Sequence, residues 1–179
     1  LDACGARDAV DVRAMLDRAE AVGVLAAVTI ADDLDAARWA VQAADWDPRV
    51  YAAVALHPTR AHALTDAARA EIEALAAHPR VVAIGETGVD LYWPGRLDGC
   101  ARPAQQRESF AWHIELAKRI GKPLMIHNRD ADAEVLDVLA AEGAPETVIF
   151  HCFSSGPEMA RTCVDAGWVL SLSGTVSFR

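Results

Sequence analysis

The stretch Val81-Val-Ala-Ile-Gly-Glu86 places an acidic residue directly behind a short apolar run. Two later stretches repeat this arrangement with histidine: Leu124-Met-Ile-His127 and Thr147-Val-Ile-Phe-His-Cys152. Short apolar runs bounded by Gly, Pro or polar residues predict buried strands. Segments with helical periodicity, residues 104–120 and 132–142, separate these strands from one another. Strands that alternate with helices in this way predict a parallel sheet whose helices form the crossovers.

The same alternation continues toward both ends of the chain. We predict earlier strands over residues 24–30 and 50–56 and a last strand over residues 168–172. This gives about six parallel strands, whereas a complete TIM-type (β/α)8 barrel has eight. The fold class is therefore α/β, and we expect residues 1–179 to form a single barrel domain that lacks its first and last strands.

Composition limits the classes of partner. The chain has 179 residues and a formal net charge of −9, and this excess of acid opposes broad, salt-driven binding to a nucleic-acid backbone. A phosphate-bearing substrate would need bound divalent cations. The longest apolar run, residues 22–31, is too short for a membrane helix and predicts a buried strand. We find no export signal, so we expect a cytoplasmic protein without a membrane partner.

Glu86, His127 and His151 each close a predicted strand, at the end where parallel barrels carry their active sites. Side chains alternate across a strand, so residues two apart share a face. The residues two positions earlier are Ile84, Met125 and Ile149. Each polar group is therefore expected above an apolar residue of the barrel interior. One carboxylate and two imidazoles suit a divalent metal, although each residue taken alone is also an ordinary turn residue.

Other residues near this end have two readings each. His57 follows the strand 50–56 and is a candidate catalytic residue, but His-Pro is also common turn chemistry. Arg129 is a candidate for binding phosphate through its planar guanidinium, or for a salt bridge with Asp130 or Asp132. Cys152 has the opposite parity to His151, which predicts a buried structural thiol that points away from the interior.

A long loop is expected over residues 88–103, directly after Glu86. Long loops at this end of an α/β protein tend to carry function. This loop contains Tyr92 and Trp93, which we expect to form a wall of the site and to contact a base or sugar of the substrate.

Five stretches carry a family resemblance. They are Ala55-Leu-His-Pro58, Gly85-Glu-Thr-Gly-Val-Asp90, Lys122-Pro-Leu-Met-Ile-His-Asn-Arg129, His151-Cys-Phe-Ser-Ser-Gly156 and Leu170-Ser-Leu-Ser-Gly174. In this order, across nearly the whole chain, they resemble the TatD family of metal-dependent deoxyribonucleases. The resemblance implies a TIM-type barrel that hydrolyses DNA phosphodiester bonds with two divalent ions (Mg, Mn or Zn). It also implies that Glu86 bridges both ions and that His127 and His151 complete one of them.

Two elements of the family pattern lie outside this sequence. The family has a His-x-His motif just before Leu-Asp, whereas this chain starts at Leu1-Asp2, and a later Glu-Thr-Asp motif does not occur before Arg179. We therefore expect a fragment of a longer protein, monomeric when complete. Two alternatives stay open: a related barrel hydrolase acting on a small ester, amide or lactone, and an inactive fragment that lacks the ligands of one metal.

Overall fold

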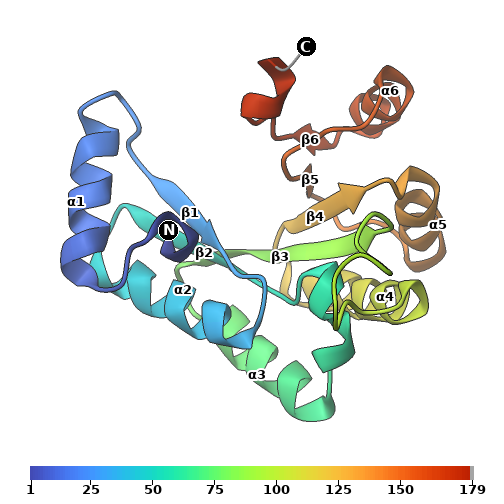
Figure 1. Ribbon diagram of the computed structural model, residues 1–179, viewed down its shortest axis with the longest axis horizontal. Helices are drawn as coiled ribbons and strands as arrows, with labels where there is room; N and C mark the ends of the chain where they lie inside the picture. The colour runs from blue at the N-terminus through green and yellow to red at the C-terminus, as the bar shows by residue number, and fades with distance from the viewer. Residues whose placement is uncertain (178–179) are drawn as a thin grey trace.

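The computed structural model describes residues 1–177, whose strands form one parallel sheet in the order of the chain (Figure 1). The strands are β1 (Ala27–Ile30), β2 (Val50–Val54), β3 (Val81–Asp90), β4 (Leu124–Arg129), β5 (Val148–Phe150) and β6 (Val169–Leu170). The six predicted strands are thus confirmed, arranged as an incomplete barrel. None of the described helices is long and apolar enough to cross a membrane.

Helices alternate with the strands. They are α1 (Ala9–Glu20), α2 (Leu34–Trp46), α3 (Asp66–Ala76), α4 (Pro103–Ile120), α5 (Asp132–Glu142) and α6 (Pro157–Asp165), with 3-10 turns η1 (Asp2–Cys4), η2 (Pro58–Ala63) and η3 (Gly174–Ser177). Helices α4 and α5 match the helical segments predicted over residues 104–120 and 132–142. Thr65 caps α3 by accepting a hydrogen bond from the backbone N–H of Ala68. Gly121 ends α4 in the left-handed conformation, which glycine adopts without steric cost.

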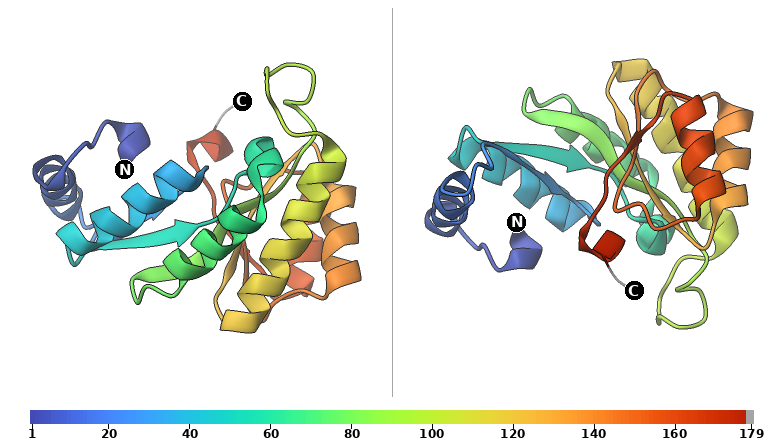
Figure 2. Two further views of the ribbon diagram at one scale, coloured as in Figure 1. Left: turned by 90° about the horizontal axis from the view of Figure 1, so that it is seen from below. Right: turned by 90° about the horizontal axis from the view of Figure 1, so that it is seen from above.

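The main core lies between the sheet and its helices, because α2, α3, α4 and α5 all cover one face of the sheet (Figure 2). Its largest fully buried side chains include Leu56, Ile84, Phe110 and Phe150. Burial of one such side chain contributes about 1.5–3 kcal/mol, so this layer supplies most of the stabilisation of the fold. The opposite face of the sheet carries only a small apolar cluster, which consists of Ile30, Ala53, Ala83 and Met125.

The expected alternation along β3 is interrupted between Ile84 and Thr87, where the pairing of β3 with β4 shifts register. The peptide bond Gly85-Glu86 is cis at this point. Ile84 belongs to the helix-side core, whereas Ala83 belongs to the interior cluster. The prediction that Ile84 and Glu86 share a face is therefore wrong. Glu86 nevertheless faces the interior, because the alternation slips by one residue before it.

Strand β3 also runs further than predicted. Residues 88–90 were expected in a loop, but they pair with β4, with Gly88 opposite His127 and Asp90 opposite Arg129. The loop that carries Tyr92 and Trp93 thus starts at Leu91 and leads to α4. This extension brings Asp90 to the same end of the sheet as Glu86.

The first predicted strand is shorter and less buried than expected. Strand β1 starts only at Ala27, and the preceding Val24 and Leu25 are exposed. Among the described residues β1 pairs with β2 alone, so it is an edge strand. Val28 within it remains 42% exposed. The apolar run 22–31 is therefore only partly a strand and is not buried throughout.

Candidate metal centre

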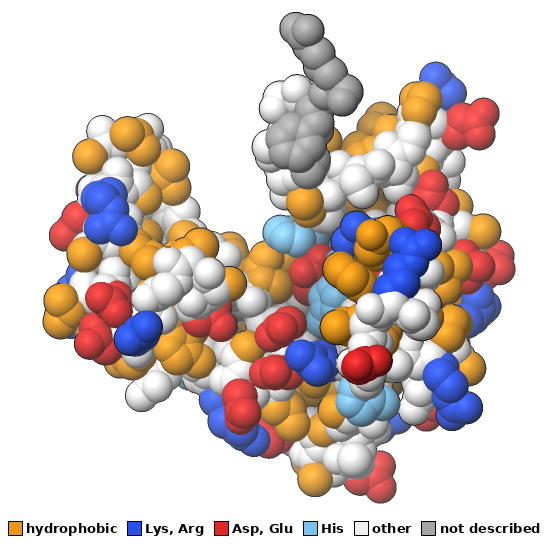
Figure 3. All heavy atoms as spheres, viewed as in Figure 1, with side chains coloured by type: hydrophobic (Ala, Val, Ile, Leu, Met, Phe, Trp, Pro, Cys, Tyr) orange, Lys and Arg blue, Asp and Glu red, His pale blue; other side chains and the backbone are white. Residues whose placement is uncertain are grey.

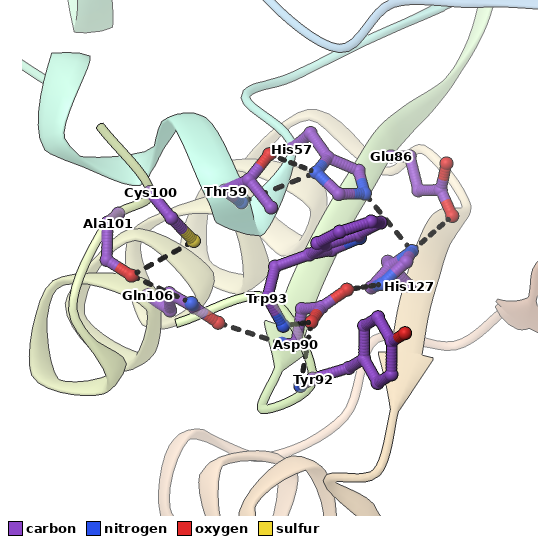
Figure 4. Close-up of polar contacts among 10 residues, drawn as sticks. All are labelled: His57, Thr59, Glu86, Asp90, Tyr92, Trp93, Cys100, Ala101, Gln106 and His127. Atoms are coloured by element: carbon purple, nitrogen blue, oxygen red, sulfur yellow. Dashed lines mark hydrogen bonds and ion pairs between the residues drawn. The ribbon is translucent and has the colours of Figure 1, made fainter. Parts of the chain in front are cut away.

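Three polar side chains meet above the interior cluster, toward the carboxyl ends of β3 and β4 and just after the end of β2 (Figure 4). His57, Glu86 and His127 each offer one ligand atom, and these atoms lie within 4.8 Å of one another. Nδ1 of His127 lies 3.0 Å from Oε1 of Glu86 and 3.1 Å from Nε2 of His57. A carboxylate and two imidazoles are common ligands of divalent metals. The donor set therefore fits a divalent ion.

His127 takes its place from the regular part of β4. Met125, two residues earlier, belongs to the interior cluster, as the alternation along this strand predicts. Figure 3 shows histidine side chains beside acidic ones in the hollow on the face of the molecule seen in Figure 1. The parity prediction for Met125 and His127 is thus confirmed, and His127 points toward the concave side of the sheet.

His57 is a turn residue, and its ring also faces the cluster. It is the N-cap of η2, where its Nδ1 lies 3.3 Å from the backbone N of Thr59 and 2.8 Å from Oγ1 of Thr59. Its other ring nitrogen, Nε2, contacts His127. The turn therefore fixes the ring so that one nitrogen faces the site.

Asp90, four residues past Glu86, is a further residue of this site, and no role is predicted for it from the sequence. Its side chain is fully buried, and Oδ2 lies 2.8 Å from Nε2 of His127. The four-residue spacing of Glu86 and Asp90 places both on one face of a strand, provided that the strand continues. This signal was available, but it was missed because we expected the strand to end at Glu86.

His127 lies between two carboxylates, and this decides its charge. Burial alone lowers the pKa of His127, but hydrogen bonds to Asp90 and Glu86 outweigh burial and raise this pKa to about 9. Burial raises the pKa of both Glu86 and Asp90, but the hydrogen bond with His127 and the positive charge of its ring, joined for Asp90 by the backbone N–H groups of Trp93 and Tyr92, together outweigh burial and leave both pKa values lowered. Without a metal, His127 is therefore an imidazolium at neutral pH.

His57 behaves in the opposite way. Burial, and then the positive charge of His127, lower the pKa of His57 to about 4. His57 is thus a neutral imidazole at pH 7 and can act as a metal ligand or accept a proton.

His151, the third predicted ligand, lies at the same end of the sheet but outside this compact cluster. Strand β5 ends at Phe150, and the backbone N–H of His151 donates to the carbonyl of Ile126. The side chain of His151 lines a pocket of about 290 Å³ together with His127 and Arg129. The structure thus brings Glu86 and His127 into contact, and it places His57 rather than His151 beside them.

Cys152 departs from its predicted position. It is half-buried, lines the same pocket as His127, and its Sγ donates to Oγ of Ser173 at 2.9 Å. Its φ of 49° lies in the left-handed region, so the chain has left the alternation of the strand at this residue. The prediction of a buried thiol that points away from the interior is therefore wrong.

Arg129 lies beside the aromatic loop rather than in either predicted salt bridge. Its guanidinium carbon is 3.9 Å from the ring centre of Tyr92 and 5.4 Å from that of Trp93. Asp132 instead accepts hydrogen bonds from Asn128 and Ser155. Arg129, Tyr92 and Trp93 therefore form one cationic and aromatic wall next to His127, which we call the Arg-aromatic wall.

Comparison with known proteins identifies the family of the chain. The family described as TatD related DNase matches residues 5–179. An uncharacterized metal-dependent hydrolase TatD from Mycobacterium tuberculosis is 77% identical over the whole chain, which covers 68% of that protein. A 3'-5' ssDNA/RNA exonuclease TatD from Musicola paradisiaca is 30% identical over 93% of the chain and 62% of its own length.

A solved structure shows the same fold. The crystal structure of YjjV, a TatD homolog from Escherichia coli K12, superposes with a TM-score of 0.84 at 26% identity. The match covers 94% of this chain and 64% of that one. The chain thus spans about two thirds of the length of these relatives. On the family match and the 77% identity, the chain belongs to the TatD family of metal-dependent hydrolases.

Proposed function

We propose that this chain carries the divalent-metal centre of a hydrolase that cleaves DNA phosphodiester bonds. The observation that supports this most directly is the cluster of His57, Glu86 and His127, whose ligand atoms lie within 4.8 Å at the carboxyl end of a parallel sheet. Catalytic residues of barrel enzymes lie at this end. A bound ion would also offset the acidic charge of the chain where a phosphate must approach.

Glu86 and His127 are the two ligands common to the predicted set and to the observed cluster. We propose His57 and His151 as the histidines that add to them, since one contacts His127 and the other lines the adjoining pocket. The same proposal includes what the resemblance implies: where two ions are bound, Glu86 would be a ligand of both. When bound, a divalent ion polarises a phosphoryl oxygen and lowers the pKa of a coordinated water.

The side chains of the chain then divide the remaining tasks. His57 is neutral beside Glu86, so its ring can offer a lone pair to the ion without first losing a charge-carrying proton. The guanidinium of Arg129 can bind phosphate oxygens through its planar donors. Tyr92 and Trp93 offer aromatic faces, on which unpaired bases stack. Such stacking is consistent with a single-stranded substrate, and the relative from Musicola paradisiaca is named for acting on one.

The test compares Glu86→Ala and His127→Ala with His78→Ala. His78 pairs with Asp45, far from the cluster at the opposite end of the sheet, so it is a matched histidine control. We expect the first two variants to lose tight binding of Mn²⁺ or Zn²⁺ and hydrolysis of a single-stranded DNA oligonucleotide, and the control to keep both. Metal binding unchanged in Glu86→Ala would contradict the proposed centre.

The substrate class is tested separately. A single-stranded oligonucleotide, a phosphodiester dye and an acyl ester are offered to the same metal-loaded protein. We expect cleavage of the first two only. Cleavage of the ester alone would instead assign the centre to a small ester, amide or lactone.

A further inference from the structure

Asp90 connects the two parts of the site described above. One carboxylate oxygen, Oδ2, lies 2.8 Å from Nε2 of His127. The other, Oδ1, accepts hydrogen bonds from the backbone N–H groups of Tyr92 and Trp93, each at 2.9 Å. Both oxygens of this fully buried side chain are therefore in use, one toward the proposed metal ligand and one toward the Arg-aromatic wall (Figure 4).

Asp90 is itself held in place by helix α4. Its backbone N–H donates to Oε1 of Gln106 at 2.7 Å, and Nε2 of Gln106 donates to the carbonyl of Ala101 at 3.0 Å. Gln106 is fully buried. The side chain of Gln106 thus fixes both the start and the end of the loop that carries Tyr92 and Trp93. The position of Asp90 therefore does not depend on the loop alone.

We propose that Asp90 is a positioning residue: it keeps a proton on Nε2 of His127, directs Nδ1 to the metal, and ties the Arg-aromatic wall to that ligand. The inference rests on the proposed function. A carboxylate only accepts hydrogen bonds, so in the metal-free imidazolium both ring nitrogens carry hydrogen, Nε2 toward Asp90 at 2.8 Å and Nδ1 toward Glu86 at 3.0 Å. When the ring is neutral, the closer and fully buried Asp90 keeps the hydrogen on Nε2. Nδ1, which faces the proposed ligands Glu86 and His57, is then the atom left to bind an ion. Carboxylates that orient metal-binding histidines in this way typically change metal affinity 10- to 100-fold.

The variant Asp90→Asn separates these roles. Two backbone donors face Oδ1, so the amide oxygen of Asn must stay on the side of Tyr92 and Trp93. The NH₂ group then faces Nε2 of His127, which has to accept, and the single proton of a neutral ring moves to Nδ1. The loop stays attached, whereas the metal-binding nitrogen is blocked. Asp90→Ala removes both attachments.

Asp8→Asn is the matched control. Oδ1 of Asp8 accepts from the backbone N–H groups of Val10 and Asp11, at 2.8 and 3.0 Å, which is the same turn geometry at the start of α1. Asn caps such a turn about as well as Asp. Any change in Asp90→Asn that is absent from Asp8→Asn is therefore due to the contact with His127.

Three measurements on the full chain test the proposal. The ¹⁵N spectrum of the histidine rings, recorded without metal at pH 10, should place the proton of His127 on Nε2 in the wild type and on Nδ1 in Asp90→Asn. Affinity for Zn²⁺ alone, measured by competition with a chelator, should fall 10- to 100-fold in Asp90→Asn and stay unchanged in Asp8→Asn. Hydrogen exchange at the amides of Tyr92 and Trp93 should be slow in the wild type and Asp90→Asn and fast in Asp90→Ala.

Each result decides one step. A wild-type proton on Nδ1 overturns the proposal even if no variant folds, since this measurement needs none. An unchanged Zn²⁺ affinity in Asp90→Asn, or equally slow exchange in Asp90→Ala, overturns it as well. A wild-type chain that binds no Zn²⁺ but shows the Nε2 proton would instead contradict the proposed metal function and leave the orientation of His127 by Asp90 supported.

Discussion

Gly88 of β3 lies directly against the backbone carbonyl of His127 on β4, so close that a side chain at position 88 would overlap with this oxygen. The two residues are register partners, and Gly88 has a φ of 142°, which side chains disfavour. The close approach of the two strands holds Glu86, Asp90 and His127 within reach of each other. The glycine is thus part of how the fold builds the site.

The variant Gly88→Ala tests this relationship. We expect the free energy of unfolding to fall by roughly 1–3 kcal/mol because of the unfavourable φ, and to fall further because of the overlap with His127. Gly95→Ala is the control, because Gly95 also has a positive φ, 79°, but an added Cβ would meet no atom within 4 Å. Unfolding in urea gives the free energy of unfolding of both variants. Equal losses of this free energy would show that the contact with His127 does not contribute to stability.

Buried His113 should make the chain less stable in mild acid. Burial lowers its pKa to about 4, whereas an unfolded histidine titrates near ~6.5. Its Nδ1 lies 2.7 Å from the carbonyl oxygen of Ser109, and its Nε2 accepts from the N–H of Leu56, next to His57. As pH falls from ~6.5 toward 4, the unfolded chain binds a proton that the folded chain does not bind, so the free energy of unfolding declines.

The measurement is the free energy of unfolding of the wild type and of His113→Gln between pH 7 and pH 4. The wild type should lose stability relative to the variant by up to roughly 1.4 kcal/mol per pH unit in this window. The comparison removes the contribution of His57, which is common to both proteins. A constant difference between the two proteins across this range would show that His113 takes up its proton equally in the folded and unfolded chain.

The sequence predicts the order of strands and helices well because each apolar run is short and each helix has a clear end, such as Gly121. It also predicts that Met125 and His127 share a face, since β4 is regular. The face of Glu86 depends on a register shift that arises only from pairing with β4, so a two-residue rule applied to β3 alone cannot find it.

The membership of the metal cluster could not be predicted for a similar reason. His57 and His151 both follow strands, and which of them lies beside His127 depends on where β2 and β5 end and how the next turn is built. His57 is fixed by its cap on η2, a local feature that is visible in the sequence as His-Pro. Asp90 belongs to the site only because β3 continues past Glu86. The glycine at position 88 made this continuation look like the start of a loop.

The Arg-aromatic wall gives the last prediction, because its members depend on one another. Arg129→Ala should weaken binding of a single-stranded oligonucleotide and reduce the slope of its salt dependence by about 1, as expected for one lost phosphate contact. Tyr92→Ala should cost about 1–3 kcal/mol of binding from lost base stacking, and it also removes the ring that supports Arg129 at 3.9 Å. The two losses should therefore not add in the double variant. Arg161→Ala, an exposed arginine on α6, is the control and should leave binding at moderate salt nearly unchanged. Binding measured by fluorescence anisotropy at several salt concentrations tests all four proteins, and strictly additive losses would show that Arg129 and Tyr92 contact the substrate independently.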